Sequence, residues 1–259
     1  MFVSFIGSGN LAWHLAPALD NVGFVVKEVH SRNPNNAAKL TSRLYQAEVK
    51  ATLDFSTSDS RIFIVAVSDD AIELIAQEII LPEDAFLIHT SGSQPLSILQ
   101  FAATSNTGVL YPLQTFTKTK KVDFKLTPIF FESNNSETDA MLQLIAKAIS
   151  DKVRKISSEE RKALHVAAVF ASNFTNHMLA LSKKILEQNS LDFDLLKPVI
   201  LETINKSLAV GPELGQTGPA SRGDLEILDR HLEFIKEDPQ LVEIYKMVSQ
   251  QILDKYQPE

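Results

Sequence analysis

The first twelve residues place the strongest constraint on how this chain can fold. An almost unbroken apolar run at residues 1–6 (MFVSFI) leads into GSGNLA at residues 7–12 and then into apolar residues at helical spacing. This order of strand, glycine turn and helix matches the G-x-G-x-x-G/A fingerprint of dinucleotide-binding folds, with Ala12 as the third small residue. Glycines let the backbone approach a pyrophosphate, whose charge the N–H groups at the helix start can receive. We expect the following residues to bind the dinucleotide: Gly7, Ser8, Gly9, Asn10 and Leu11.

Alternating strands and helices follow over the first 150 residues. Continuous apolar runs at 61–67 (RIFIVAV) and 85–89 (AFLIH) are typical of strands buried on both faces of a parallel sheet. Residues 70–80 between them show helical spacing. Further strands are predicted at 24–30, 49–52, 108–111 and 129–132, further helices at 36–45 and 95–101, and a turn at 133–136. The pattern indicates an α/β protein with a doubly wound, Rossmann-type parallel sheet.

The second part of the chain has a different pattern. Ser157 and Glu160 have capping-box spacing, and apolar residues then mark one face of a single helix to about residue 188. Further helices are predicted at 192–208, with Pro198 early in it or kinking it, at 225–235 and from Pro239 onward, with a glycine- and proline-rich loop at 211–223. We therefore divide the chain into a dinucleotide-binding domain, residues 1–152, and an all-α domain, residues 153–259.

Composition narrows the classes of function. The net charge of −7 argues against a broad nucleic-acid or anionic-membrane surface. The chain has no cysteine, so a disulfide, a thiol nucleophile and a cysteine-bound metal are excluded, and no metal site is predicted. No apolar run approaches the roughly 20 residues of a membrane span, and the N-terminus has no signal-peptide pattern. We expect a cytoplasmic protein without membrane or nucleic-acid partners.

The end of the second predicted strand indicates which dinucleotide is bound. In NAD-binding versions of the motif an acidic residue about 20 residues beyond the glycines binds the ribose hydroxyls. Here Ser31-Arg32-Asn33 stands at that place. A guanidinium can hold a 2′-phosphate through paired, charge-assisted hydrogen bonds, and the neighbouring side chains can donate to its oxygens. This favours NADP over NAD. The alternative is that Arg32 is a solvated surface arginine.

Two further strand ends should meet the cofactor, because ligands of open α/β sheets bind at the carboxyl ends of the strands. Val67 and Ser68 follow the fourth strand and can border the nicotinamide ribose, whereas Asp69 or Asp70 would cap the next helix. Thr90 and Ser91 follow the fifth. We assign Thr90 to the cofactor and Ser91 to a substrate carboxylate or carbonyl, the alternative being a polar loop that caps the following helix.

The all-α part offers three polar residues for the reaction. His165 can donate a proton, since its unperturbed pKa lies near working pH. Asn173 can orient a substrate oxygen, and Arg222, the only cation of the glycine-rich loop, can bind a substrate anion. At 100° per residue His165 and Asn173 fall on one side of the long helix. We expect these three residues to converge with Ser91 in one cleft between the domains, although core hydrogen bonding would explain the histidine equally well.

A resemblance adds to this interpretation. GSGNLA, VAVSDDAI, HTSGS, YPLQTF, HVAAVFASNF and TGPASRGD follow one another in this order. The chain resembles a family of NADP oxidoreductases with a Rossmann-like domain and a C-terminal helical domain of unknown function. This family has a 6-phosphogluconate dehydrogenase-like C-terminal part and is related to the deazaflavin-dependent NADP reductases and prephenate dehydrogenases. Two family signatures are absent: Tyr111 stands where prephenate dehydrogenases have a histidine, and Val169 where hydroxyacid dehydrogenases have a lysine.

The resemblance implies an NADP-binding domain, an α-helical dimerisation domain and a cleft between them. The leading hypothesis is an NADP-dependent oxidoreductase that transfers a hydride between NADP(H) and a small anionic carbonyl or hydroxyl compound. One alternative is a non-catalytic NADP-binding sensor or scaffold protein, which the absent lysine and histidine favour. Another is a deazaflavin-linked NADP reductase. The alanine-rich face of the helix from residue 157 suits close helix packing, so we also expect a homodimer through the helical domain.

Overall fold

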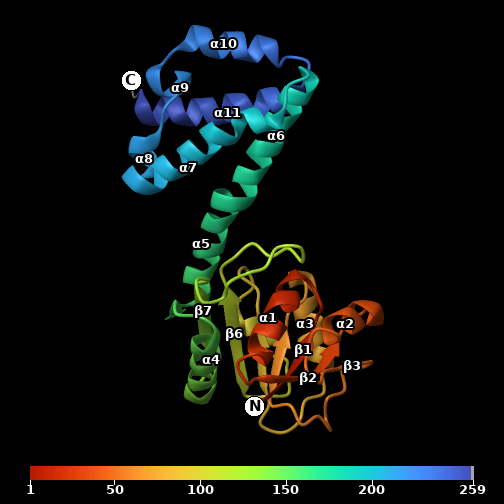
Figure 1. Cartoon of the computed structure of the whole chain (residues 1–259). Helices are drawn as coiled ribbons and strands as arrows, with labels where there is room; N and C mark the ends of the chain where they lie inside the picture. Colours follow the sequence, from red (N-terminus) through yellow and green to blue (C-terminus); the bar gives the residue numbers. More distant parts are fainter. Residues whose placement is uncertain (258–259) are drawn as a thin grey trace. The chain divides into compact units, whose positions relative to one another are not determined.

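The structure is a computed structural model that describes residues 1–257. It divides into two compact units, Met1–Ser172 and a second unit that begins at Asn173. The composition changes near residue 152, but the strand Val153–Lys155 (β8) and the helix Ser158–Ala168 (α5) still belong to the first unit. Figure 1 shows the strands of the first unit and the helices of the second.

One mixed sheet of eight strands forms the centre of the first unit, in the order β3-β2-β1-β4-β5-β6-β7-β8. All neighbouring strands are parallel except β6 and β7. The strands are β1 (Phe2–Ile6), β2 (Val25–His30), β3 (Glu48–Lys50), β4 (Ile62–Val65), β5 (Phe86–His89), β6 (Asn106–Pro112), β7 (Ile129–Ser133) and β8. The predicted Rossmann-type α/β class is confirmed, because the first six strands have the 3-2-1-4-5-6 order of dinucleotide-binding sheets.

Helices cover both faces of this sheet. In β4, Ile62 and Ile64 pack into one apolar cluster, whereas Phe63 and Val65 pack into a second one. Side chains alternate between the faces of a strand, so a run that is apolar at every position is buried on both sides. The helical elements are α1 (Asn10–Asp20), α2 (Pro34–Thr41), η1 (Asp69–Ala71), α3 (Ile72–Glu78), η2 (Leu96–Leu99), α4 (Ser136–Ile149) and α5.

Two elements of the first unit were missed by the sequence interpretation. The predicted turn at 133–136 contains Asn135, whose side chain accepts a hydrogen bond from the Thr138 N–H and so caps helix α4. The strand β8 corrects the expectation that the chain is all-α from residue 153. It has only three residues and pairs with β7 alone, so the sequence carries almost no periodic signal for it.

The second unit is helical throughout its described part, as predicted. Pro198 lies in the first turn of its helix, so it does not kink it. The glycine- and proline-rich segment contains two short helices. The elements are α6 (Thr175–Gln188), η4 (Phe193–Leu196), α7 (Lys197–Val210), α8 (Pro212–Gly215), α9 (Pro219–Arg222), α10 (Leu225–Phe234) and α11 (Pro239–Tyr256). Within residues 1–257, no helix combines the length and the apolar character that crossing a bilayer requires.

The long helix predicted from residue 157 is present, but it is not α-helical throughout. Its capping box is confirmed, since the Ser157 hydroxyl accepts from the Glu160 N–H and the Glu160 carboxylate accepts from the Ser157 N–H. A π-helical segment, Val169–Phe174, separates α5 from α6. Hydrogen bonds of a π-helix run from i to i+5, so its turn is wider than that of an α-helix. The uniform 100° spacing that placed His165 and Asn173 on one side is therefore wrong across this segment.

Candidate functional site

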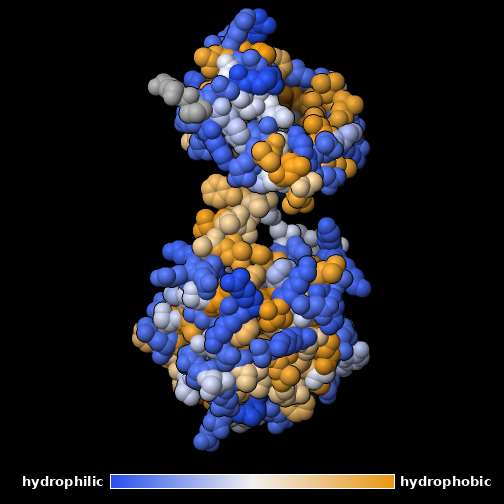
Figure 2. Space-filling view, turned by 90° about the vertical axis from the view of Figure 1, so that its left-hand side faces the viewer, coloured by the Kyte–Doolittle hydropathy of each residue, from blue (hydrophilic) through white to orange (hydrophobic). Residues whose placement is uncertain are grey.

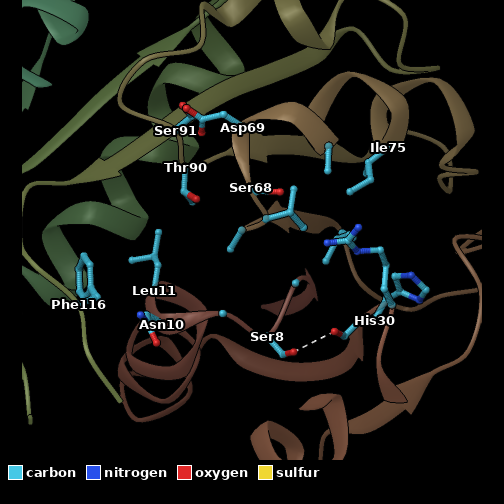
Figure 3. Close-up of a pocket in the computed structure, with 18 of the residues that line it drawn as sticks. Ser8, Asn10, Leu11, His30, Ser68, Asp69, Ile75, Thr90, Ser91 and Phe116 are labelled. Carbon is cyan, nitrogen blue, oxygen red and sulfur yellow. Dashed lines mark hydrogen bonds between the residues drawn. The ribbon is translucent and has the colours of Figure 1, made fainter. Parts of the chain in front are cut away.

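The first unit contains one large pocket at the carboxyl ends of its central strands. It has a volume of about 1100 Å³ and is lined by residues from the ends of β1, β2, β4, β5 and β6 and from α5. Figure 3 shows Ser8 and His30 with Ser68, Thr90 and Ser91 around it. The predicted residues that line it are Gly7, Ser8, Gly9, Asn10, Leu11, Ser31, Arg32, Val67, Ser68, Thr90, Ser91 and His165.

The glycine turn between β1 and α1 forms the floor of this pocket. Gly7 has φ +113°, and a Cβ atom there would lie 2.1 Å from the Ala66 carbonyl oxygen. The Gly7 N–H donates to the His30 carbonyl, 2.8 Å away, which holds the turn against β2. Gly9 occupies the N-cap position of α1, where no side chain accepts from the first turn. The first N–H groups of α1 are therefore available to an anion, which fits a dinucleotide pyrophosphate.

The end of β2 contributes the predicted 2′-phosphate site. The Ser8 hydroxyl donates to the Ser31 hydroxyl, 2.9 Å away, so the glycine turn and this strand end are joined (dashed line in Figure 3). Arg32 lines the pocket. The Ser68 hydroxyl, with a weaker contribution from the Arg32 guanidinium, lowers the pKa of Asp70. Asn33 does not line the pocket, because its side chain caps α2 by accepting from the Asn35 N–H at 3.0 Å.

The loop after β5 is held by a buried arginine that sequence reasoning missed. The Arg161 side chain, 1% exposed, forms a 2.7 Å ion pair with Glu132 of β7. Its Nε donates to the Ser91 carbonyl at 3.2 Å, and its other terminal nitrogen donates to the Gln94 carbonyl. Glu132 also accepts from the Ser158 hydroxyl at 2.8 Å. Arg161 therefore ties the loop, the sheet and the start of α5 together.

These contacts of Arg161 hold the loop so that Gly92 lies against the rings of Tyr111 and His165. The Tyr111 hydroxyl and His165 Nδ1 are 3.0 Å apart and share a hydrogen bond. A Cβ atom at Gly92 would lie 2.5 Å from His165 Nδ1 and 2.8 Å from the Tyr111 ring, so any larger residue would displace one of them. Burial raises the pKa of Tyr111, so its phenol holds its proton more tightly than an exposed tyrosine does. Both residues line the pocket, so their hydrogen bond connects two proton-carrying groups that a ligand can reach.

Several lining residues were not selected from the sequence. Tyr111 lies at the carboxyl end of a predicted strand, which is a usable signal for a site residue, although the family comparison marks it only as a departure from the prephenate dehydrogenase pattern. Gly92 follows Ser91 in a loop whose sequence carries no signal for a close approach to Tyr111 or His165. Asn36, Phe116 and Lys118 also line the pocket. Their segments lie in a helix and a loop, for which the sequence carries no signal of proximity to the glycine turn.

Asn173 and Arg222 belong to the second unit, and their convergence with Ser91 and His165 stays a prediction. Within that unit, Arg222 forms an ion pair with Asp224, with 2.8 Å between the charged atoms. Asp224 occupies the N-cap position of α10, as predicted, but its side chain makes no capping hydrogen bond. In the first unit, Asp69 accepts from the Ser93 hydroxyl and so connects the turn after β4 with the loop after β5.

His89, at the end of β5, is fully buried behind this loop. Its Nδ1 accepts from the Ser91 N–H at 3.2 Å. Burial, assisted by the nearby Arg161 charge, lowers its pKa to about 3. The neutral ring therefore carries its proton on Nε2. Because the folded pKa lies below the unfolded value of 6.5, the unfolded chain takes up a proton first as the pH falls.

We expect His89 to make the fold less stable in mild acid. The stability that depends on neutral His89 is fully present above the unfolded pKa and is lost as the pH falls. We expect the free energy of unfolding to decrease by about 2 kcal/mol between about pH 7.5 and about pH 5. Urea unfolding of the wild type and of His89→Gln across this range would measure it. The variant should show a shallower pH dependence than the wild type, because glutamine does not titrate. Equal slopes for the two proteins would contradict the assignment.

The geometry defines the class of protein. It is a Rossmann-type protein whose dinucleotide-binding pocket also contains the hydrogen-bonded rings of Tyr111 and His165. Among solved structures, a "putative NADP oxidoreductase" from Bacteroides fragilis is 38% identical, with 98% of each chain covered and a TM-score of 0.90. A family model, Domain of unknown function (DUF2520), matches residues 127–252. The chain belongs to the family of this oxidoreductase, whose members combine a Rossmann-like part with a helical part.

More distant structures share the fold alone. A protein from Thermotoga maritima is 23% identical, with 98% of each chain covered and a TM-score of 0.71. A reductive aminase from Aspergillus terreus, in complex with NADPH and ethyl-5-oxohexanoate, is 12% identical, with 98% of this chain and 93% of that chain covered and a TM-score of 0.73. A search of curated proteins finds no match.

Proposed function

We propose that the protein is an NADP(H)-dependent oxidoreductase that reduces a small anionic carbonyl compound, or oxidises the corresponding alcohol. One observation carries this proposal. A single pocket contains the glycine turn and Arg32, which suit NADP(H), together with the hydrogen-bonded pair Tyr111 and His165, which suits proton transfer. The family relative from Bacteroides fragilis, described as a "putative NADP oxidoreductase", supports it.

The residues around the pocket fit each part of NADP(H). The Gly7 turn leaves room for a pyrophosphate, and the uncapped start of α1 supplies N–H donors to it. Ser31 and Arg32 would hold the 2′-phosphate. Val67, Ser68 and Thr90 would border the nicotinamide half. Among residues 1–257, no carboxylate forms a salt bridge with Arg32, so its charge is available to a phosphate.

We expect NADPH to bind at least about tenfold more tightly than NADH, because a charge-assisted contact to the 2′-phosphate contributes about 1.4 kcal/mol or more. Arg32→Asp should reverse this preference, since a carboxylate repels the phosphate and accepts from ribose hydroxyls. Isothermal titration calorimetry with both coenzymes would measure the change. Lys39→Asp, on exposed α2 outside the pocket, makes the same change of charge and should leave the preference intact. Equal affinities of the wild type for both coenzymes would exclude the NADP assignment.

Tyr111 and His165 would supply the proton that the reduction consumes. Bound NADPH would supply a hydride to the substrate carbon. Tyr111 would donate its phenolic proton to the substrate oxygen as negative charge develops there, and His165 would replace that proton through their hydrogen bond. Ser91 would orient the substrate oxygen. The products are the alcohol and NADP⁺, with one proton taken from solvent.

Loss of the Tyr111 hydroxyl should therefore lower the turnover rate strongly and change the affinity for the coenzyme only slightly. We expect Tyr111→Phe to lower kcat by about 10²–10³-fold, as for loss of a positioned general acid. The dissociation constant for NADPH should change less than about threefold, within the ordinary scatter of such effects. NADPH oxidation over a panel of small oxo acids and aldehydes, followed by calorimetry of the variant, would test this. NADPH binding without turnover on any panel member would favour the sensor or scaffold alternative.

The second unit is proposed to form a homodimer interface. Large apolar side chains of its helices are exposed, and Figure 2 shows hydrophobic areas among its polar ones. Leu208 and Leu214, each 83% exposed, are the most exposed of them. Monomers seldom expose large apolar areas without a partner. Light scattering should give a mass near twice the 28.7 kDa of one chain, and a mass of 28.7 kDa would contradict the proposal.

A further inference from the structure

The loop between β6 and β7 brings an additional cation to the pocket. Lys118 lines it together with Phe116, Asn10 and Leu11, and with Arg32 it supplies the lysine and arginine side chains of the lining. Lys118 forms no salt bridge with any acidic residue in the described range 1–257. Lys118 is exposed. It therefore adds to the pocket a positive charge that the motif at residues 7–12 does not provide.

Contacts with α1 hold this loop near the start of that helix. The Thr117 carbonyl accepts a hydrogen bond from His14 Nε2, with 2.8 Å between the atoms. The rings of His14 and Phe116 are 5.9 Å apart. Lys118 Nζ lies 4.9 Å from the centre of the Trp13 ring, in a cation–π contact. Lys118 is therefore positioned beside the first turns of α1, where the pyrophosphate is expected, and Figure 3 shows Phe116 among the residues that line this part of the pocket.

We propose that Lys118 binds the pyrophosphate of the coenzyme and leaves the Trp13 ring when it does so. This inference rests on the proposed coenzyme function. An anionic ligand competes favourably for the ammonium group, because the cation–π contact of a solvent-exposed lysine is weaker than a charge-assisted contact to phosphate. The Trp13 ring also faces Arg43, whose guanidinium lies 4.1 Å from the ring centre, so the indole keeps one cation after Lys118 departs.

The two cations of the pocket should affect coenzyme binding differently. The pyrophosphate is common to NADPH and NADH, whereas the 2′-phosphate belongs to NADPH alone. Lys118→Met should therefore weaken both coenzymes to the same extent, about tenfold, as expected for one charge-assisted hydrogen bond. Substitution of Arg32 should weaken NADPH selectively. Raising the salt concentration should narrow the difference between the wild type and Lys118→Met, because the lost interaction is electrostatic.

Trp13 provides a direct readout, because it is the only tryptophan of the chain. Titration of the wild type, Lys118→Met and Lys120→Met with NADPH and with NADH would be followed by Trp13 fluorescence and by calorimetry. Lys120 lies on the same loop, is exposed and does not line the pocket, so it is the matched control. Melting temperatures would verify that all three proteins fold.

The expected result is an equal loss of affinity for both coenzymes in Lys118→Met and wild-type affinity in Lys120→Met. Unchanged affinities in Lys118→Met, or a loss confined to NADPH, would overturn the pyrophosphate assignment while leaving the proposed function intact. Failure of the wild type to bind either coenzyme would instead overturn the proposed function, and this inference with it.

Discussion

Replacing Arg161 with methionine should lower the free energy of unfolding by about 3–5 kcal/mol, the range for breaking a buried ion pair. The reason is the set of groups left behind. Glu132 would keep a largely buried carboxylate without its 2.7 Å partner, and the Ser91 and Gln94 carbonyls would lose a donor. Methionine fills a similar volume without supplying any hydrogen bond. Chemical denaturation of both proteins at neutral pH would measure the difference.

Two further variants separate the lost ion pair from a general effect of the substitution. Lys162→Met changes the neighbouring residue of α5, which is exposed, and should alter stability by less than about 0.5 kcal/mol. The double variant Arg161→Met with Glu132→Met removes both charges, so it should be more stable than the sum of the single changes predicts. A simple sum would show that Arg161 and Glu132 do not stabilise each other, and an Arg161→Met variant as stable as the wild type would show that the contacts of Arg161 contribute little.

Gly7→Ala should be the most damaging change of a single methyl group in the first unit. The added Cβ would lie 2.1 Å from a backbone oxygen, and the residue has φ +113°, where side chains are strained. We expect a loss of more than about 3 kcal/mol in unfolding free energy, as for severe overpacking combined with backbone strain. Thermal denaturation, with NADPH titration of any folded fraction, would measure both consequences.

Gly23→Ala is a suitable control for this prediction. Gly23 has φ +92°, but a Cβ atom there would meet no atom within 4 Å. It should therefore cost only the backbone strain of about 1–2 kcal/mol. Equal losses of unfolding free energy in the two variants would contradict this prediction. They would show that the close approach of Gly7 to the Ala66 carbonyl has no effect beyond backbone strain.

Local signals in the sequence were sufficient for the central sheet and the glycine turn. The apolar runs at β1, β4 and β5 are long enough to identify strands without any partner, and the motif at residues 7–12 carries its own geometry. The capping box of Ser157 and Glu160 is equally local, since both hydrogen bonds join residues three positions apart. Such features depend on neighbours in the chain, and they were predicted correctly.

Features that depend on distant partners were not predicted. Arg161 appears in the sequence as one more charged residue of an amphipathic helix, and its burial follows only from a loop some 70 positions earlier and a strand 29 positions earlier. The π segment Val169–Phe174 has an ordinary helical composition, so its hydrogen-bond pattern leaves no mark on periodicity. The Tyr111 and His165 pair joins residues 54 positions apart.

The position of Arg161 and His165 on one helix has a consequence for how the protein is made. Synthesis proceeds from the N-terminus, and domains generally fold as units as they emerge. A nascent chain that has exposed every strand of the sheet still lacks the arginine that neutralises Glu132 and the histidine that meets Tyr111. The pocket can be completed only after the first two turns of α5 have left the ribosome. A chain cut after β8 would therefore lack the partner of the largely buried Glu132 carboxylate and the contacts that hold the loop after β5.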